Sequence, residues 1–236
     1  MRKKRILFCG EATYLNTGYA TYGREVLRRL YDTEKYDLAE FASYGTLKDA
    51  STYGIPWAFY PNMPDQSNKA QVDQYNSVPT NQFGEWRFEE VLLNFKPDIV
   101  FDIRDFWMLD YQQRSPFRKM FTWAIMPTVD AEPQNEQWIA TFADANAVFN
   151  YSDWGYEVLK TESNGAINCL GSAPPSADAA YQPVEDKKQH KNSLGFESDT
   201  KIIGTIMRNQ RRKLFPDLFE SFRKFLDITK KQNVFL

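Results

Sequence analysis

Residues that build metal sites and disulfides are scarce in this sequence: its 236 residues include two cysteines and one histidine. Cys9 and Cys169 each lie in a short apolar run typical of a buried strand, so we expect packed thiols rather than a disulfide or metal ligands. His190 lies in a polar, lysine-rich stretch, where a solvated linker residue is far more common than a catalyst. We therefore expect a reducing compartment and no metal site.

Long hydrophobic runs and an excess of charge of one sign are also absent. No window approaches the ~18 apolar residues of a membrane span, and the apolar run after MRKKR is too short for a signal peptide. Lys and Arg number 29 against 31 Asp and Glu, a net charge of −2, which gives no reason to expect a nucleic-acid partner. We expect a cytoplasmic protein that binds anions only locally, with a basic tip that could touch a membrane surface.

The glycine-rich fingerprint of dinucleotide-binding proteins is missing after the first apolar run. Residues 5–10 predict a central parallel strand, and the loop EATYLNTGYAT then leads into a helix that ends near residue 30. Because this loop lacks G-x-G-x-x-G, the sequence argues against a dehydrogenase. Asn16, Thr17 and Gly18 would let the backbone approach a ligand closely. A plain turn and helix cap is the alternative interpretation.

Short apolar runs alternate with helical periods over most of the chain, and 42% of its residues are hydrophobic and 16% aromatic. Strands are predicted at 36–43, 55–60, 121–126 and 167–170, and one each within KPDIVFDIRD (96–105) and the start of ADANAVFNYSDWGYEVLK (143–160). Helices are predicted from residue 85, around residue 138 and after Ser152, a candidate N-cap. The polar, proline-containing stretch 61–84 predicts a long surface loop, which is either functional or an ordered excursion without a ligand. The pattern indicates an α/β, doubly wound parallel sheet (Rossmann-like) from residue 1 to 173.

Charged residues follow two of the predicted strands. Asp102, Arg104 and Asp105 lie at the end of KPDIVFDIRD, and Asp130 and Glu132 follow the strand at 121–126. Open α/β sheets bind ligands at the carboxyl ends of their strands, so we expect Gly18, Asp105 and Asp130 on one rim. A surface salt-bridge cluster is the alternative for the first group.

The chain after residue 173 has a different organisation. Residues 174–197, rich in Pro, Ala, Ser and charge, predict an interdomain linker. Residues 201–213, KIIGTIMRNQRRK, predict a strand to residue 207 and a basic turn before an amphipathic helix over 214–230. The N-terminus of such a helix presents N–H groups to an anion, and Arg208 and Lys213 would add charge. The alternative is a solvated, basic helix start. Residues 198–236 contain only the first βα unit of a second Rossmann-like domain and a strand fragment, which cannot enclose a core.

Taken together, these segments resemble the glycosyltransferases of the two-domain GT-B fold, in particular the retaining, family 4-like group. Their second domain opens with a strand, an Arg, a short variable turn and a Lys, which look like Arg208 and Lys213. The family usually has Gly before this Arg and after this Lys, where the chain has Met207 and Leu214. The resemblance implies transfer of a sugar from a nucleotide-sugar donor with retention and without a metal or cofactor. Arg208, Lys213 and Gly18 would bind the donor.

The resemblance also implies where the acceptor binds. In the family the loop after the fifth strand lines the acceptor pocket and often carries a functional His; here Asp130 is the nearest polar substitute and our candidate catalytic residue. The acceptor-side candidates are Asn16, Thr17, Tyr19, Asp105 and Glu132. The family's second domain has two acidic residues seven apart in its later part, which residues 1–236 do not include, so we expect these residues alone to be inactive. We also expect self-association through the apolar face of the last helix, or local disorder after Ser198. A non-catalytic nucleotide- or sugar-binding module of the same fold is the alternative.

Overall fold

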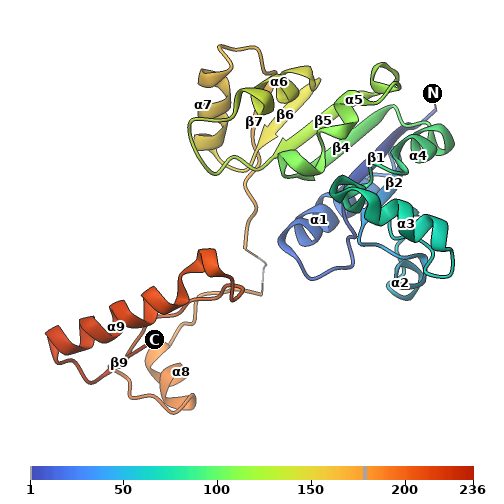
Figure 1. Cartoon of the computed structure of the whole chain (residues 1–236). Coiled ribbons are helices and arrows are strands. Elements are labelled where there is room, and N and C mark those ends of the chain that lie inside the picture. The colour runs from blue at the N-terminus through green and yellow to red at the C-terminus, as the bar shows by residue number, and fades with distance from the viewer. Residues whose placement is uncertain (1, 178–179) are drawn as a thin grey trace. The chain divides into compact units, whose positions relative to one another are not determined.

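The computed structural model describes residues 2–177 and 180–236, and the chain divides into two compact units (Figure 1). Unit 1 is Met1–Ser176 and unit 2 is Ala177–Leu236. Among the described residues, no helix has both the length and the apolar character that crossing a membrane requires.

Unit 1 is built on a parallel sheet of seven strands in the order β3-β2-β1-β4-β5-β6-β7. Its strands are β1 Lys4–Glu11, β2 Tyr36–Ser43, β3 Ala58–Pro61, β4 Ile99–Arg104, β5 Thr122–Pro127, β6 Ala147–Asn150 and β7 Cys169–Ser172. Its α-helices are α1 Gly18–Asp32, α2 Leu47–Thr52, α3 Lys69–Ser77, α4 Phe88–Phe95, α5 Tyr111–Arg114, α6 Glu136–Asp144 and α7 Asp153–Glu162. The 3-10 helices are η1 Pro79–Phe83, η2 Phe106–Met108 and η3 Arg118–Met120. The predicted doubly wound α/β fold is confirmed.

Strand order reverses between β1 and β4, and this reversal positions the candidate site. The chain first builds outward from β1 through β2 to β3, and then returns to place β4 on the other side of β1. In open α/β sheets, ligands bind at the carboxyl ends of the strands next to such a reversal.

Apolar side chains cover both faces of the sheet, as expected for parallel strands buried on two sides. In β1, Ile6 and Phe8 pack with Leu27 of α1 on one face. Leu7 and Cys9 belong to the larger core on the other face, to which α4, α6 and α7 contribute. Cys9 and Cys169 are both free thiols, as predicted, and the second is only half-buried. The predicted cap of α7 is confirmed, because Ser152 Oγ accepts the Gly155 N–H at 3.1 Å.

The prediction of a surface loop over residues 61–84 is wrong. This stretch contains α3, capped by Asn68, whose side chain accepts the Gln71 N–H at 3.2 Å, and then η1. Asn62 is buried and donates to the backbone oxygens of Asn81 at 2.9 Å and Gln82 at 2.8 Å. Tyr75 is the one buried residue of α3 and packs edge-on against Trp86, so the helix has no repeating apolar face that its sequence could reveal.

Asp102 and Arg104 form a buried pair. For these two residues, the predicted role at a ligand-binding strand end and the alternative of a surface salt-bridge cluster are therefore both wrong. Asp102 accepts hydrogen bonds from Arg104 Nε at 2.9 Å, Gln112 Nε2 at 2.8 Å and Trp123 Nε1 at 2.9 Å. Burial raises the pKa of Asp102. Arg104 also donates to the backbone oxygen of Phe83 at 2.7 Å. The pair thus ties η1 to the centre of the sheet.

Unit 2 contains α8 Lys187–Ser193, β8 Lys201–Ile202, η4 Arg211–Lys213, α9 Phe215–Thr229 and β9 Val234–Phe235. β8 and β9 are parallel and α9 connects them, which makes one βαβ unit. The strand predicted over 201–207 is corrected to the two residues of β8, which pair with the two residues of β9. α8 lies inside the stretch 174–197 predicted as a linker, of which residues 178 and 179 lie outside the described part of the chain.

Candidate functional site

The predicted rim residues all follow the carboxyl ends of parallel strands. Gly18 is the first residue of α1, in the connection that leaves β1, and Asp105 directly follows β4. Asp130 lies three residues after β5. Since β1, β4 and β5 are adjacent and parallel, the structure places Gly18, Asp105 and Asp130 at the same edge of the sheet.

A buried carboxylate fixes the start of the loop after β1. Glu40 of β2 accepts the Thr13 N–H at 2.7 Å, the Thr13 hydroxyl at 2.8 Å and the Trp57 indole N–H at 2.8 Å. Burial raises the pKa of Glu40, and these three donors oppose that rise. Arg24 of α1 also donates to the backbone oxygen of Thr13 at 2.7 Å. The loop therefore enters the rim in a fixed conformation.

The N-terminus of α1 is capped and open to solvent. Thr17 Oγ1 accepts the Ala20 N–H at 3.2 Å and donates to the carboxylate of Glu11, so the helix-cap interpretation holds for Thr17. Asn16 and Gly18 are exposed. A Cβ added at Gly18 would meet no described atom within 4 Å. The backbone at Gly18 is thus accessible, which agrees with the interpretation that this loop lets the backbone approach a ligand.

Tyr19 links the loop after β1 to the ends of β4 and β5. Its phenol donates to Asp105 Oδ1 at 2.6 Å and lies 2.7 Å from Thr128 Oγ1. Burial raises the pKa of Tyr19, so the phenol keeps its proton at neutral pH and Asp105 acts as acceptor. Among the described residues, no protein group donates to Asp105 Oδ2. The half-buried carboxylate is held by one oxygen and offers the other to a ligand.

Two further candidates, Asp130 and Glu132, are exposed, and neither side chain has a hydrogen-bond or ion-pair partner among the described residues. Their roles stay predictions. Sequence reasoning missed Thr128 and Tyr151, which follow β5 and β6 at the same rim. The phenol oxygen of Tyr151 is buried without a partner among the described residues. The sequence signal for both is their position directly after a predicted strand.

In unit 2, Arg208 is exposed in an irregular segment, and Lys213 ends η4 two residues before α9 begins. Neither side chain forms a hydrogen bond or ion pair with another described residue. α9 starts after Leu214, which has a left-handed φ of 53° and provides no side-chain cap. The basic start of α9 is therefore open to an anion, and it is equally compatible with a solvated helix start.

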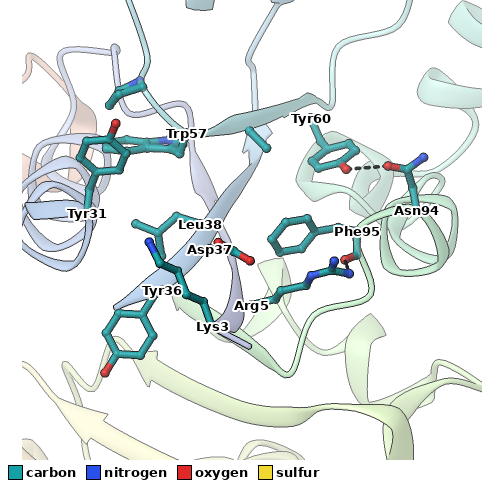
Figure 2. Close-up of a pocket in the computed structure, with 12 residues that line it drawn as sticks. Lys3, Arg5, Tyr31, Tyr36, Asp37, Leu38, Trp57, Tyr60, Asn94 and Phe95 are labelled. Atoms are coloured by element: carbon teal, nitrogen blue, oxygen red, sulfur yellow. Dashed lines mark hydrogen bonds between the residues drawn. The ribbon is translucent and has the colours of Figure 1, made fainter. Parts of the chain in front are cut away.

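A hollow of about 460 Å³ lies at the opposite edge of unit 1, near the amino ends of β1, β2 and β3 (Figure 2). It contains none of the predicted site residues. Across the described residues, no group of three or more His, Cys, Asp or Glu side chains is arranged so that it could hold a metal ion.

No protein-family model matches the sequence. No curated protein matches it either. Among solved structures, sucrose-phosphate synthase from Thermosynechococcus elongatus superposes with a TM-score of 0.64 over 94% of this chain, at 13% sequence identity. The chain has the GT-B fold.

Two other structures show the same GT-B likeness. UGT89C1 of Arabidopsis thaliana, complexed with UDP-L-rhamnose, matches 100% of this chain with a TM-score of 0.54 and 10% identity. A putative UDP-N-acetylglucosamine 2-epimerase from Listeria monocytogenes matches 99% with a TM-score of 0.56 and 14% identity. This chain spans 60%, 65% and 61% of the three structures, in the order given. At these identities the likeness shows the fold.

Proposed function

We propose that this GT-B chain belongs to an enzyme that acts on a nucleotide sugar, and that the enzyme is a glycosyltransferase that retains the configuration of the transferred sugar. The observation that carries the proposal is Asp105, held by Tyr19 at the point where strand order reverses, with its Oδ2 open. Structures of the same fold are named for sucrose-phosphate synthase and for a complex with UDP-L-rhamnose, which supports a sugar-nucleotide substrate.

Unit 1 would bind the acceptor. Asp105 Oδ2 would accept a hydrogen bond from the attacking hydroxyl, and Tyr19, which keeps its proton, would hold the carboxylate in one orientation. A fixed acceptor removes orientational freedom before the reaction, which is a large contribution to rate. Asn16 and Thr17 are next to the open backbone at Gly18, whose N–H at the start of α1 suits a ligand oxygen. Asp130, the candidate catalytic residue, and Glu132, a further acceptor-side candidate, lie in the connection after β5.

Unit 2 would bind the donor diphosphate. Sugar transfer develops negative charge on the leaving diphosphate, and fixed cations near a helix N-terminus stabilise that charge without a metal. Arg208 and Lys213 precede α9 and have no competing acidic partner among the described residues. Both side chains are therefore available to a diphosphate.

The test is a titration of UDP and GDP into the full-length protein, compared with Arg208→Ala, Lys213→Ala and the control Lys231→Ala. A charge-assisted hydrogen bond contributes about 1.5–3 kcal/mol, so each site variant should bind roughly 10- to 100-fold more weakly. Lys231 is an exposed lysine beyond the C-terminus of α9, and its loss should leave the affinity unchanged. Equal affinity in wild type and both site variants would contradict the donor site.

A hydrolysis assay on the same protein distinguishes sugar transfer from simple binding. Hydrolysis of UDP-glucose and GDP-mannose measures sugar transfer to water, and Asp105→Asn should slow it by about 10²-fold, the lower end of what a positioned proton acceptor contributes. The Kd for the diphosphate should not change in this variant. If wild type binds diphosphate but releases no sugar, the non-catalytic binding module is favoured over the transferase.

A further inference from the structure

The hollow at the amino edge of the unit 1 sheet has the size of a ligand site. Its volume of about 460 Å³ falls within the ~300–1,000 Å³ typical of small-molecule sites. Strands β1, β2 and β3 are parallel, so their amino ends lie at the edge opposite to the rim that carries Asp105. A molecule bound here would not occupy the acceptor site proposed above.

Aromatic rings form two walls of this hollow (Figure 2). Tyr31, from the last turn of α1, and Trp57, just before β3, lie on one side with their ring centroids 6.0 Å apart. Tyr60 of β3 and Phe95 at the end of α4 lie on the other side, with centroids 6.2 Å apart. Tyr31 remains 44% exposed although it is large and apolar. The two walls thus offer flat apolar surface that no described residue covers completely.

Polar side chains between the two aromatic walls could form hydrogen bonds with a ligand. Arg5 and Asp37 are register partners on β1 and β2, yet they form no ion pair. Instead Arg5 donates to the backbone oxygen of Phe95 at 3.1 Å, and its guanidinium lies 6.0 Å from the Phe95 ring centroid. Among the described residues, neither Asp37 nor Lys3 has a hydrogen-bond or ion-pair partner. A carboxylate acceptor and an ammonium donor therefore face the space between the rings (Figure 2).

One amide at the edge of the hollow is oriented by its neighbour. The Tyr60 phenol donates to Asn94 Oδ1 at 2.6 Å. This bond fixes the amide so that its Nδ2 is the group left to donate. Asp37 thus supplies an acceptor, and Lys3 and Asn94 supply donors, on a surface bounded by aromatic rings.

We propose that this hollow binds a neutral oligosaccharide. Sugar rings present C–H faces that pack against aromatic rings, and their hydroxyls both donate and accept, which matches Asp37, Lys3 and Asn94. An anion fits less well, because the Asp37 carboxylate lies among the cations and would repel it. A purely apolar ligand would bury Asp37 and Lys3 without partners, which is costly. The proposal concerns a second site and does not rest on the proposed transfer reaction.

The test is a ¹H–¹⁵N NMR titration of the protein with maltohexaose, cellohexaose and chitohexaose, and with UDP as the anionic probe. We expect at least one hexasaccharide to shift backbone signals of residues 36–38 and 94–95. Tyr31→Ala and Asp37→Ala should each weaken its binding about tenfold, or ~1.4 kcal/mol. Both side chains are exposed, so neither variant should unfold.

The matched control is Tyr181→Ala, which removes a tyrosine that is 78% exposed and outside the hollow. It should bind the hexasaccharide with wild-type affinity. The proposal is overturned if no hexasaccharide shifts these signals, if UDP shifts them instead, or if Tyr31→Ala and Asp37→Ala bind as tightly as the control.

Discussion

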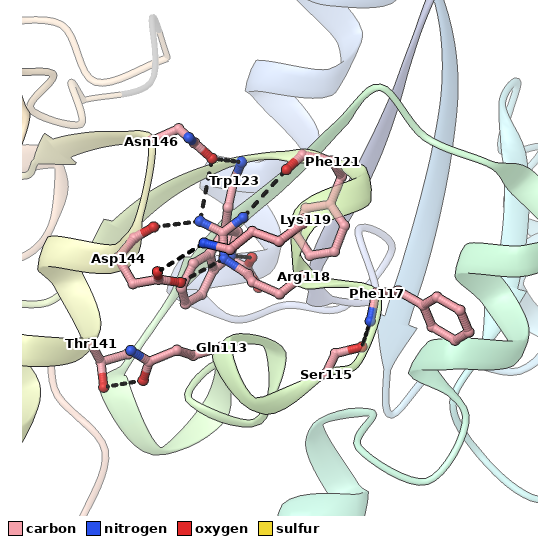
Figure 3. Close-up of polar contacts among 11 residues, drawn as sticks. Gln113, Ser115, Phe117, Arg118, Lys119, Phe121, Trp123, Thr141, Asp144 and Asn146 are labelled. Atoms are coloured by element: carbon pink, nitrogen blue, oxygen red, sulfur yellow. Dashed lines mark hydrogen bonds and ion pairs between the residues drawn. The ribbon is translucent and has the colours of Figure 1, made fainter.

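Arg118 shows how one side chain joins separate parts of unit 1 (Figure 3). It lies in η3, and its Nε donates to Asp144 Oδ2 at 2.7 Å, while Nη2 donates to the backbone oxygen of the same residue. Nη1 donates to the backbone oxygen of Phe121 at 3.3 Å. The guanidinium also lies 5.0 Å from the Trp123 ring centroid. The end of α6 is thereby fastened to the start of β5.

We expect Arg118→Ala to lower the free energy of unfolding by about 3 kcal/mol, because it leaves the backbone oxygens and the Asp144 carboxylate without their donor. Lys119→Ala is the control: its side chain is 88% exposed and its Nζ lies 3.8 Å from the same carboxylate, so its loss should cost under ~0.5 kcal/mol. Urea unfolding followed by circular dichroism measures both. Similar losses in the two variants would show that the buried arrangement around Arg118 contributes little.

The carboxylates near β4 show which properties of single residues the sequence could and could not predict. The sequence predicted Asp102 and Asp105 at the end of this strand, which is correct for Asp105, whereas Asp102 lies inside β4 and pairs with Ile125. It could not show that Asp102 is buried, because the indole that satisfies it comes from Trp123, on the neighbouring strand. Nor could it show that Tyr19 would reach Asp105 across 86 residues. Such partners depend on which strands become neighbours in the fold.

At the scale of elements, the packing of α1 on β1 depends on a glycine. A Cβ built at Gly23 would lie 2.6 Å from Phe8 Cζ, and that ring is buried in the core between helix and sheet. Gly18 is in the same helix, but a Cβ there meets no described atom within 4 Å. The two glycines of α1 therefore serve different purposes: close packing at one position and an accessible backbone at the other.

We predict that Gly23→Ala destabilises the protein by about 1–2 kcal/mol, since overpacking costs ~1–3 kcal/mol and exceeds the gain in helix propensity of up to ~1 kcal/mol. Gly18→Ala, with no clash to offset the gain, should be neutral or slightly stabilising. Chemical unfolding of both variants at one pH checks this. A neutral Gly23→Ala would mean that Phe8 moves aside without cost.

Prediction of elements succeeded where an apolar period identifies a buried face. β1, β4, α1 and α4 all contribute to the two cores and were predicted within a few residues of their ends. It failed over 61–84, where the buried Asn62 donates to backbone oxygens, Asn68 accepts the capping bond of α3, and the helix buries only Tyr75. It also extended the strand beyond residue 202, whereas β8 pairs with β9 through Lys201 and Ile202.

For the molecule as a whole, the fold class was predictable because alternating strands and helices leave few topologies. What composition could not reveal is how unit 1 uses its aromatic residues. Burial raises the pKa of many of its phenols and of the Cys9 thiol; the tyrosines are Tyr14, Tyr19, Tyr22, Tyr44, Tyr60, Tyr75, Tyr111 and Tyr151. Above pH ~9–10 the unfolded chain loses these protons while the folded chain keeps them. Stability is therefore fully present below that pH and falls as the pH rises further.

Tyr151→Phe tests this linkage at one group, and we expect it to stabilise the protein. Burial raises the pKa of Tyr151, and its hydroxyl has no partner among the described residues, so removing it relieves a desolvation cost of ~1–3 kcal/mol at pH 8. The loss of unfolding free energy between pH 8 and pH 11 should also shrink by about 1 kcal/mol, because one phenol fewer is ionised on unfolding. Urea titrations at both pH values measure the two effects, with Tyr181→Phe, an exposed tyrosine, as the control that should change neither. If Tyr151→Phe is less stable than wild type at pH 8, the hydroxyl forms a hydrogen bond in solution. If the loss of unfolding free energy between pH 8 and pH 11 is unchanged, this phenol does not contribute to that loss.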